Sequence, residues 1–369
     1  MNSQPDVAIL LDHFGKGGVE RVACHLANGL HRRGLRVEFA VLQDAGPVRQ
    51  LLDDGISVHV LRTMGSLPRG ARLLAGVPDL ARYLRTRRPA LFHSPGNHTH
   101  MAASLAVRLA AFGDVFVPKI TNPIFKQGMK AWKRALRRQI YSRAFDPADR
   151  ILVLSEPAVA RLGAIRPDFV DKAVFLHNPY VSEAMAAQDL VRGAPETPVI
   201  LTVGRLSRQK DQATLLRAAA LLQDRPWRLR ICGTGPDQDA LQELARQLAI
   251  ADRVEFVGFV DDMVPYYAEA TVMALSSRWE DLPATLIEAM ACGCPVVSTA
   301  SSGAVVELLE AVGARAPVPV GDPAALADAL REALDGRLPV VGREMMLAYA
   351  IEASCDAHAA LFSGLLGRG

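Results

Sequence analysis

Short runs of Val, Ile and Leu alternate with longer segments of helical periodicity along most of the chain. The short runs are continuously apolar, which is typical of parallel strands that helices cover on both faces. This pattern predicts an α/β fold with doubly wound parallel sheets. The predicted strands are residues 7–11, 36–42, 57–61, 91–93, 115–120, 151–155 and 173–177, then 199–203, 228–232, 254–257, 272–275 and 295–299.

A stretch that contains Pro179, Pro195 and Pro198 separates the two series of strands. A chain of 369 residues is also too long for one hydrophobic core and fits two domains. We therefore predict an N-terminal Rossmann-like domain at residues 1–180, a linker at 181–198 and a second Rossmann-like domain at 199–345. Residues 346–369 are predicted to form a helix that packs back toward the N-terminal domain.

Charge is distributed unevenly between the two halves. Residues 1–180 carry 26 Lys and Arg against 14 Asp and Glu, a net +12, whereas residues 181–369 carry 16 against 25, a net −9. This asymmetry supports the two-domain division and raises the question of what the basic half contacts.

The N-terminus lacks the basic and apolar segments of a signal peptide, and no apolar run approaches the roughly 18 residues of a membrane span. Five scattered cysteines are typical of reduced thiols, so we expect a cytoplasmic protein. Cys292 and Cys294 have no second Cys or His pair at zinc spacing, and we predict no metal site there.

The loop after the first predicted strand contains Gly15, Gly17 and Gly18 before a predicted helix. Glycines permit a tight turn whose N–H groups point at an anion, beside the helix N-terminus. The loop is neither a Walker A motif nor G-x-G-x-x-G, because Glu20 stands where the last glycine should be. A plain glycine turn is an equally good interpretation.

Two cations, Arg205 and Lys210, lie in the loop after the strand at 199–203, before a helix that Asp211 could cap. A guanidinium fork and an ammonium point charge suit a diphosphate. A solvated basic loop fits the pattern equally well.

The next loop places Gly233 and Gly235 after a strand and Pro236 at a predicted helix start, which would leave free N–H groups beside a ligand. Asp237 and Asp239 have the spacing of a metal-binding D-x-D pair. Acidic residues are common in the first turn of a helix, where the helix dipole stabilises them, so we favour capping over a metal.

Two carboxylates follow the strand at 272–275: Glu280 in the loop and Glu288 inside an apolar helical segment. Pro283 fits the first turn of that helix and Gly293 its C-terminal end. A carboxylate in so apolar a segment needs a partner, and two converging carboxylates could accept hydrogen bonds from sugar hydroxyls. An exposed helix Glu plus a loop Glu is the alternative.

The stretch from residue 276 to 299, SSRWEDLPATLIEAMACGCPVVST, resembles the E-x7-E signature of the retaining GT-B glycosyltransferases of family 4. The chain also carries, in the order of that family, GKGGVERVACHLANGLHRRG, LHNPY, VGRLSRQKDQATLLRA and ICGTGPDQDALQELARQL. The resemblance implies two Rossmann-like domains that face a central cleft. It also implies transfer of a sugar from a nucleotide-diphosphate sugar, with retention and without a metal or other cofactor.

The resemblance assigns Glu288 to the ribose hydroxyls and Glu280 to the donor sugar, and it places Arg205 and Lys210 on the diphosphate. Gly17 and Gly18 would approach donor phosphate and acceptor. It further implies donor contacts from the backbone of Asp281, Leu282, Pro283 and Ala284, and nucleotide-pocket walls at Gly233, Gly235 and Val260.

Two features depart from the family pattern. Asp281 replaces the glycine that usually follows the first acid. Relatives also carry a His near the reacting sugar after the fourth strand, where this chain has Pro95. Of the nearby His93, His98 and His100, we select His98 as the site residue.

A basic amphipathic helix is predicted between Lys126 and Arg143. It could lie on an anionic membrane surface, or it could be a solvated face over ordinary core. No nucleic-acid recognition motif is present. Its cations are Lys126, Lys130, Lys133, Arg134, Arg137, Arg138 and Arg143, and its apolar residues are Met129, Trp132, Leu136, Ile140 and Tyr141.

These observations favour a glycosyltransferase, peripheral on the inner face of the cytoplasmic membrane. Its donor would be a nucleotide-sugar, with UDP favoured from the resemblance alone, and its acceptor a glycan or polyprenyl-linked glycan. The alternatives are a GT-B-type nucleotide-sugar epimerase and a non-catalytic subunit that binds nucleotide-sugars.

Overall fold

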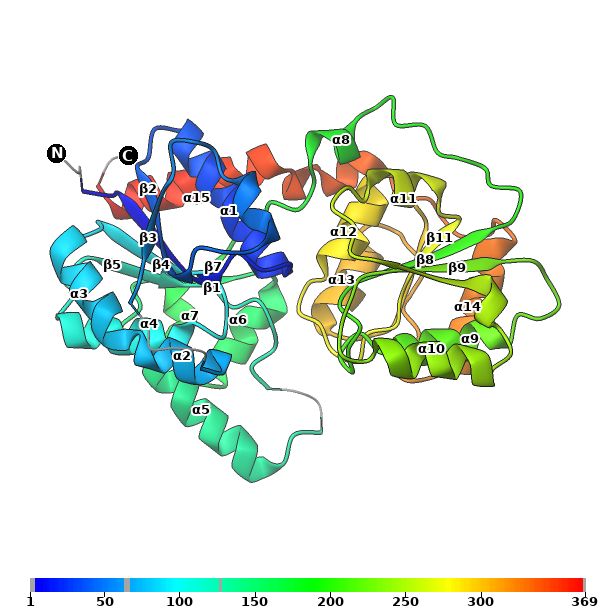
Figure 1. Ribbon diagram of the computed structural model, residues 1–369, viewed down its shortest axis with the longest axis horizontal. Coiled ribbons are helices and arrows are strands. Elements are labelled where there is room, and N and C mark those ends of the chain that lie inside the picture. The colour runs from blue at the N-terminus through cyan, green and yellow to red at the C-terminus, as the bar shows by residue number, and fades with distance from the viewer. Residues whose placement is uncertain (1–3, 63–66, 126–127, 368–369) are drawn as a thin grey trace. The chain divides into compact units, whose positions relative to one another are not determined.

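The computed structural model describes residues 4–62, 67–125 and 128–367. The chain forms two compact units, which we call the N-terminal and C-terminal domains (Figure 1). The N-terminal domain comprises Met1–Pro179 together with Ile351–Gly369, and the C-terminal domain comprises Tyr180–Ala350. Residues 181–198, which we had assigned to a linker, therefore belong to the C-terminal domain, as do residues 346–350.

The N-terminal domain contains a five-stranded parallel sheet in the order β3-β2-β1-β4-β5. Its switch point, where the strand order reverses, lies between β1 and β4. The strands are β1 (Val7–His13), β2 (Val37–Gln43), β3 (Ser57–Val60), β4 (Leu91–Ser94) and β5 (Val115–Pro118). The helices are α1 (Gly18–Arg32), η1 (Pro47–Leu51), α2 (Arg69–Ala75), α3 (Val77–Arg87), α4 (His100–Ala110), α5 (Ala131–Phe145), α6 (Glu156–Gly163), α7 (Phe169–Lys172) and α15 (Ile351–Leu365).

The last two strands of this domain, β6 (Ile151–Val153) and β7 (Ala173–Phe175), form a separate parallel pair. A single bridge between Lys119 and Leu152 connects this pair to the segment that follows β5. The apolar runs therefore predict both strands correctly, but they do not reveal that β6 and β7 lie outside the main sheet.

The C-terminal domain repeats the arrangement in the order β10-β9-β8-β11-β12, with its switch point between β8 and β11. The strands are β8 (Val199–Val203), β9 (Arg228–Cys232), β10 (Val254–Gly258), β11 (Val272–Leu275) and β12 (Val296–Ser298). The helices are α8 (Glu183–Ala186), α9 (Gln212–Ala220), α10 (Gln238–Gln247), η2 (Ala251–Arg253), α11 (Val264–Glu269), α12 (Ala284–Ala291), α13 (Gly303–Ala311), α14 (Pro323–Leu334) and η3 (Arg343–Tyr349).

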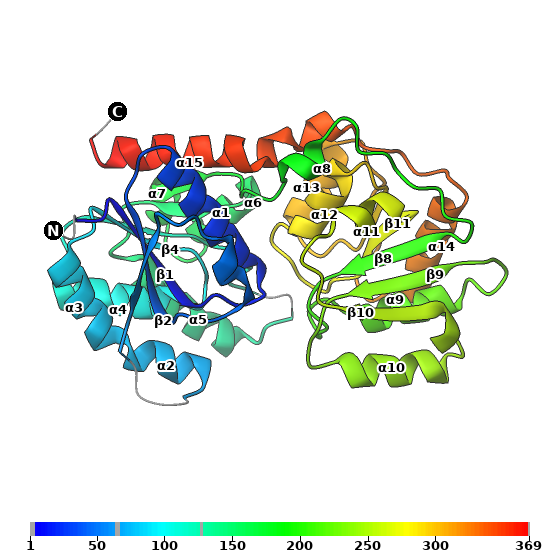
Figure 2. The same cartoon turned by 45° about the horizontal axis from the view of Figure 1, so that its top comes forward.

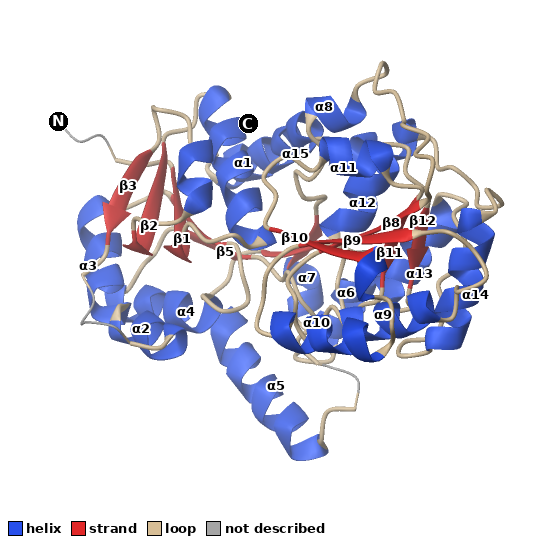
Figure 3. Ribbon diagram, turned by 45° about the vertical axis from the view of Figure 1, so that its right-hand side comes forward, coloured by secondary structure: helices blue, strands red, loops and turns tan. Residues whose placement is uncertain are grey.

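Helices cover both faces of each sheet, which explains the continuously apolar strands (Figure 3). In β1, Ala8 and Leu10 belong to one buried cluster, whereas Val7, Ile9 and Leu11 belong to the cluster on the opposite face. Successive strand side chains point to opposite faces, so a strand with two covered faces must be apolar at every position. The predicted doubly wound α/β fold is confirmed.

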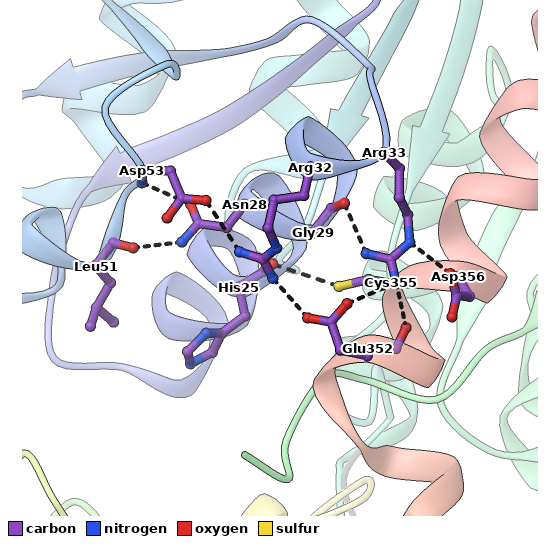
Figure 4. A network of polar contacts seen from close by, with 10 residues as sticks. All are labelled: His25, Asn28, Gly29, Arg32, Arg33, Leu51, Asp53, Glu352, Cys355 and Asp356. Carbon is purple, nitrogen blue, oxygen red and sulfur yellow. Dashed lines mark hydrogen bonds and ion pairs between the residues drawn. The ribbon is translucent and has the colours of Figure 1, made fainter. Parts of the chain in front are cut away.

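The C-terminal helix α15 packs against α1 in the N-terminal domain (Figure 2). Arg33 donates hydrogen bonds to Glu352 at 2.9 Å and to Asp356 at 2.7 Å, and Arg32 also pairs with Glu352 (Figure 4). At the crossing point, Gly29 faces Cys355. The absence of a side chain at Gly29 therefore lets the two helices approach closely.

Lys119 is buried beneath α15, and its Nζ lies 3.0 Å from His358 Nε2. His358 Nδ1 lies 2.7 Å from the Ser354 carbonyl oxygen, so this nitrogen carries the proton and Nε2 accepts from the amine. Burial lowers the pKa of Lys119 to about 7. The helix is therefore held both by surface ion pairs and by an interior hydrogen bond.

No helix in the described part of the chain combines the length and the apolar character that crossing a membrane requires.

Gly29→Ala tests the approach of α1 and α15. A Cβ at this position would lie 2.2 Å from Cys355 Sγ and 2.6 Å from Cys355 Cβ. We expect the free energy of unfolding to fall by about 1–3 kcal/mol, as in other overpacked cores, in urea titrations followed by circular dichroism. The control is Gly70→Ala, because a Cβ there meets no atom within 4 Å. Equal stability of the two variants would contradict the close crossing.

Candidate functional site

An ion pair lies at the carboxyl edge of the C-terminal sheet. Lys210 Nζ, from the loop after β8, is 2.7 Å from Glu280 Oε1, from the loop after β11. Glu280 is only 6% exposed, and Ser277 Oγ donates a second hydrogen bond to it at 2.8 Å. Because a buried carboxylate is costly without partners, these contacts fix Glu280 at the switch point between β8 and β11.

Hydrogen bonds hold the two loops that carry this pair against each other. Ser276 Oγ donates to the carbonyl oxygens of Lys210 and Asp211, both at 3.0 Å. Gln209 Nε2 donates to the Trp279 carbonyl oxygen at 3.0 Å. Arg205 is exposed in the same loop as Lys210, so two cations do border one edge of the sheet.

Asp211 stands at the N-cap of α9, but its side chain does not cap the helix as we had expected. Its φ is +49°, and its carboxylate instead pairs with Arg278 at 2.9 Å and accepts from Thr214 Oγ1 at 2.8 Å. The residue therefore joins the loop after β11 to the loop after β8.

Gly233 and Gly235 let the loop after β9 touch the loop after β8. A Cβ on Gly233 would lie 2.0 Å from the Gly204 carbonyl oxygen, and one on Gly235 would lie 2.1 Å from the Leu206 carbonyl oxygen. The Gly233 N–H donates to Gly258 O at 2.6 Å, so it is not a free donor for a ligand, contrary to our expectation. These glycines form a backbone wall of the candidate site. Val260 lies in the loop that follows β10 (Val254–Gly258).

The predicted helix start at Pro236 is also displaced: α10 begins at Gln238, with Asp237 as its N-cap and Asp239 in its first turn. No side-chain cap hydrogen bond forms at Asp237. Within the described residues, no group of three or more His, Cys, Asp and Glu is placed to hold a metal ion.

Glu288 lies on α12 and is half-buried, not fully exposed. Its Oε2 accepts a hydrogen bond from Tyr267 Oη at 2.7 Å. Burial and the neighbouring carboxylate raise the pKa of Tyr267 well above its usual value, so the phenol stays a donor. Sequence reasoning predicted that Glu288 needs a partner but did not identify Tyr267, which comes from α11.

The segment between the two carboxylates is well packed. Asp281, Leu282 and Pro283 are buried, Ala284 begins α12, and Ser302 Oγ donates to the Asp281 carbonyl oxygen at 2.7 Å. Glu280 is thus held in a packed loop and Glu288 on a packed helix. Ser277 donates a hydrogen bond to Glu280, and Tyr267 donates one to Glu288.

The three candidate histidines of the N-terminal domain lie in different environments. His93 and His100 are fully buried, and burial lowers the pKa of each to about 3. His93 Nδ1 bonds to Val117 O at 2.8 Å and His100 Nδ1 to Ser94 Oγ at 2.9 Å. His98 is half-buried, and its Nε2 lies 2.5 Å from Arg69 Nη2. The structure therefore places His98 in direct contact with a charged side chain, that of Arg69.

Arg69 belongs to a charged cluster that sequence reasoning missed. Asp12, near the end of β1, accepts two hydrogen bonds from Arg72, at 2.9 and 2.7 Å, and lies 3.3 Å from Arg69. Glu20, in the first turn of α1, lies 3.4 Å from Arg69. Gly17 is the N-cap of that helix and Gly18 its first residue. The i, i+3 spacing of the two arginines on α2 was the available signal.

Two family models match the chain: "Glycosyl transferase 4-like domain" over residues 17–179 and "Glycosyl transferases group 1" over residues 197–336. HepE of Anabaena, solved in complex with UDP and glucose, superposes with a TM-score of 0.72 at 18% identity, over 99% of this chain and 98% of that one. Fold and family models together define a GT-B glycosyltransferase. The chain belongs to the glycosyltransferases, with a glycosyl transferase 4-like domain followed by a glycosyl transferases group 1 domain.

Curated relatives match over shorter segments. The lipopolysaccharide core biosynthesis glycosyltransferase LpsE of Rhizobium meliloti is 38% identical over 108 residues, 29% of this chain and 31% of that protein. The N-acetylgalactosamine-N,N'-diacetylbacillosaminyl-diphospho-undecaprenol 4-alpha-N-acetylgalactosaminyltransferase of Campylobacter jejuni is 28% identical over 198 residues, 53% of this chain and 54% of that one. The matches thus span between about a third and about half of these relatives.

Tyr267→Phe tests the partner of Glu288. Removing the hydroxyl leaves a half-buried carboxylate without this donor, so we expect the free energy of unfolding to fall by about 1.5–3 kcal/mol. Fluorescence of Trp227, which is buried in the core of the same domain, reports the transition. Tyr266→Phe, one position away and half-buried, is the matched control and should change stability by less than about 0.5 kcal/mol. Equal effects of the two changes on stability would contradict the hydrogen bond assigned between Tyr267 and Glu288.

Proposed function

We propose that this chain is a retaining glycosyltransferase that moves a hexose or N-acetylhexosamine from a UDP-sugar to a hydroxyl of a glycan or lipid-linked glycan. The observation that carries the proposal is the Lys210–Glu280 pair at the switch point of the C-terminal sheet, with Arg205 in the same loop. Ligands of doubly wound sheets bind at this position.

The charge at this edge suits a nucleotide diphosphate as leaving group. Transfer breaks the bond between the anomeric carbon and a diphosphate oxygen, so negative charge grows on the diphosphate. Arg205 and Lys210 would stabilise that charge as preorganised cations, without a metal ion. Glu288, held by Tyr267, would accept hydrogen bonds from the ribose hydroxyls, and Glu280 would face the sugar.

Relatives support the donor and acceptor classes. HepE of Anabaena was solved in complex with UDP and glucose. The name of the Campylobacter enzyme includes a diphospho-undecaprenol acceptor, and that of the Rhizobium enzyme places it in lipopolysaccharide core biosynthesis. These relatives favour a UDP-sugar and a glycan or lipid-linked acceptor for this chain.

Calorimetric titration of UDP, GDP and ADP in EDTA tests the donor site. We expect UDP to bind the wild type, and Glu288→Ala to bind it at least about tenfold more weakly, a loss of about 1.4 kcal/mol. Glu307→Ala, an exposed glutamate on helix α13 of the same domain, should bind UDP like the wild type.

Equal UDP binding to Glu288→Ala would show that this carboxylate does not hold the ribose. If no diphosphate binds, the donor proposal fails and the non-catalytic alternative gains support. A UDP-sugar labelled in the sugar separates the remaining alternatives, because a transferase moves the label to an acceptor, whereas an epimerase leaves it on the nucleotide or as the free sugar.

We also propose that α5 holds the enzyme on an anionic membrane surface. Its apolar residues Trp132, Leu136 and Ile140 are 61%, 50% and 37% exposed, so they do not cover ordinary core. Figure 1 shows α5 extending outward from the N-terminal domain. Exposed apolar residues among cations are typical of helices that lie in the membrane interface. The cations on or beside the helix are Lys130, Lys133, Arg134, Arg137, Arg138 and Arg143; Lys126 lies outside the described residues.

Cosedimentation with vesicles tests this helix. We expect binding to vesicles that contain about a third phosphatidylglycerol and much weaker binding to neutral vesicles, with affinity falling as salt rises. Trp132→Ala with Lys133→Glu should reduce binding at least about tenfold, because it removes both an apolar and an electrostatic contact. Arg82→Glu, an exposed charge reversal on α3, is the control. Equal loss in both variants would mean that net charge alone, not α5, attracts the membrane.

A further inference from the structure

Arg69 joins His98 to the charged cluster at the end of β1. Its Nη2 lies 2.5 Å from His98 Nε2 and 3.4 Å from Glu20 Oε1, and its Nε lies 3.3 Å from Asp12 Oδ2. One guanidinium therefore contacts an imidazole and two carboxylates. This arrangement bears on the reaction because His98 is the histidine that the family resemblance selects as a site residue near the reacting sugar.

The contact determines where the imidazole carries its proton. A guanidinium has five N–H donors and no acceptor, and it stays protonated at every pH a protein tolerates. His98 Nε2 must therefore accept the hydrogen bond with its lone pair. The ring is then neutral, and its single proton lies on Nδ1.

The surrounding charges hold Arg69 in place. Asp12 is buried; burial raises its pKa, but Arg72 and Arg69 more than offset this, so the carboxyl is ionised. The cluster then contains the two cations Arg69 and Arg72 and the two anions Asp12 and Glu20. Its formal charges balance, so we do not interpret it as an anion-binding site. It is a scaffold that orients one guanidinium.

The other side of the ring is confined by Gly96. A Cβ at this position would lie 3.0 Å from His98 Cε1, 3.2 Å from His98 Nδ1 and 2.9 Å from Val19 Cγ1. The imidazole thus lies between a glycine backbone and a fixed guanidinium, which limits its rotation.

We propose that Arg69 is a positioning residue that holds His98 as a neutral imidazole with its proton on Nδ1, so that His98 serves as a hydrogen-bond donor to a substrate oxygen and not as a base. The role of His98 as a donor to a substrate oxygen rests on the proposed function. The protonation state that it assigns can be tested without substrate.

The charged and titratable neighbours agree with this assignment. Burial, followed by Arg69, lowers the pKa of His98 to about 4, and His13 acts in the same direction. Asp12 on β1 opposes them, and His100, on the same segment as His98, is itself neutral through burial. Removing Arg69 takes away a cation and leaves Asp12 and Glu20 less compensated. Both changes favour the imidazolium, so the pKa of His98 must rise.

Nitrogen NMR of protein labelled with ¹⁵N-histidine tests the proposal, with His98 signals assigned through His98→Gln. In the wild type we expect the Nδ1–H tautomer at neutral pH and a titration midpoint at about pH 4. In Arg69→Met, mixed tautomers and a midpoint at least about one pH unit higher are expected. Arg69→Lys keeps a cationic N–H donor for His98 Nε2 and should retain the Nδ1–H form. Arg82→Gln, an exposed arginine on α3, should match the wild type.

Transfer kinetics provide the second readout. We expect Arg69→Met to lower kcat about tenfold or more while the KM for the UDP-sugar stays within about twofold, because the donor site is in the other domain. Wild-type His98 that is charged or Nε2–H at neutral pH overturns the proposal, even if Arg69→Met fails to fold. An unchanged His98 spectrum in a folded Arg69→Met does so too. A wild type that has the expected spectrum but transfers no sugar would instead refute the proposed function.

Discussion

The Lys210–Glu280 ion pair is the contact on which the candidate donor site depends. It neutralises a carboxylate that is buried at the end of a parallel sheet, and it joins loops that leave adjacent strands in opposite directions around the switch point. Breaking one partner of such a pair leaves a costly buried charge. The proposed diphosphate would therefore have to compete with Glu280 for the Lys210 ammonium. Arg205, which is exposed in the same loop, would supply a second cation and so offset this competition.

The two domains place charged groups by the same topological rule. In each sheet the first strand lies beside the fourth, so that β1 neighbours β4 and β8 neighbours β11. Parallel strands end at one edge, and the loops after the first and fourth strands therefore meet. Asp12 lies near the end of β1 and His98 follows β4. Likewise, Lys210 follows β8 and Glu280 follows β11. Strand order alone thus selects which distant sequence segments can form a site.

Apolar runs predicted every strand to within two residues, because covered parallel strands need apolar side chains throughout. The sequence motifs were sufficient to identify Glu280, Glu288 and Lys210 as candidate site residues, because each lies in or just after a loop that follows a predicted strand. Tyr267 and Arg69 were missed, because each reaches its partner through helix packing. The i, i+3 spacing of Arg69 and Arg72 places the two arginines on one face of α2, but it does not reveal which side chains they contact. The misassigned Gly233 N–H has the same cause: its acceptor, Gly258, belongs to a neighbouring strand end. Sequence spacing reveals which groups stand near a loop, whereas tertiary contacts decide their hydrogen bonds.

The N-terminal domain is completed by residues from the other end of the chain. Cys355 and Phe362 of α15 belong to the same buried cluster as Ile9 of β1, and His358 is the hydrogen-bond partner of the buried Lys119. Before α15 packs against the domain, Lys119 lacks both its hydrogen-bond partner and the helix that buries it. One face of the N-terminal sheet also lacks part of its apolar contacts. Contacts between such distant segments form late and slow folding. The N-terminal domain, although synthesised first, therefore reaches its final core only after the whole C-terminal domain has been made.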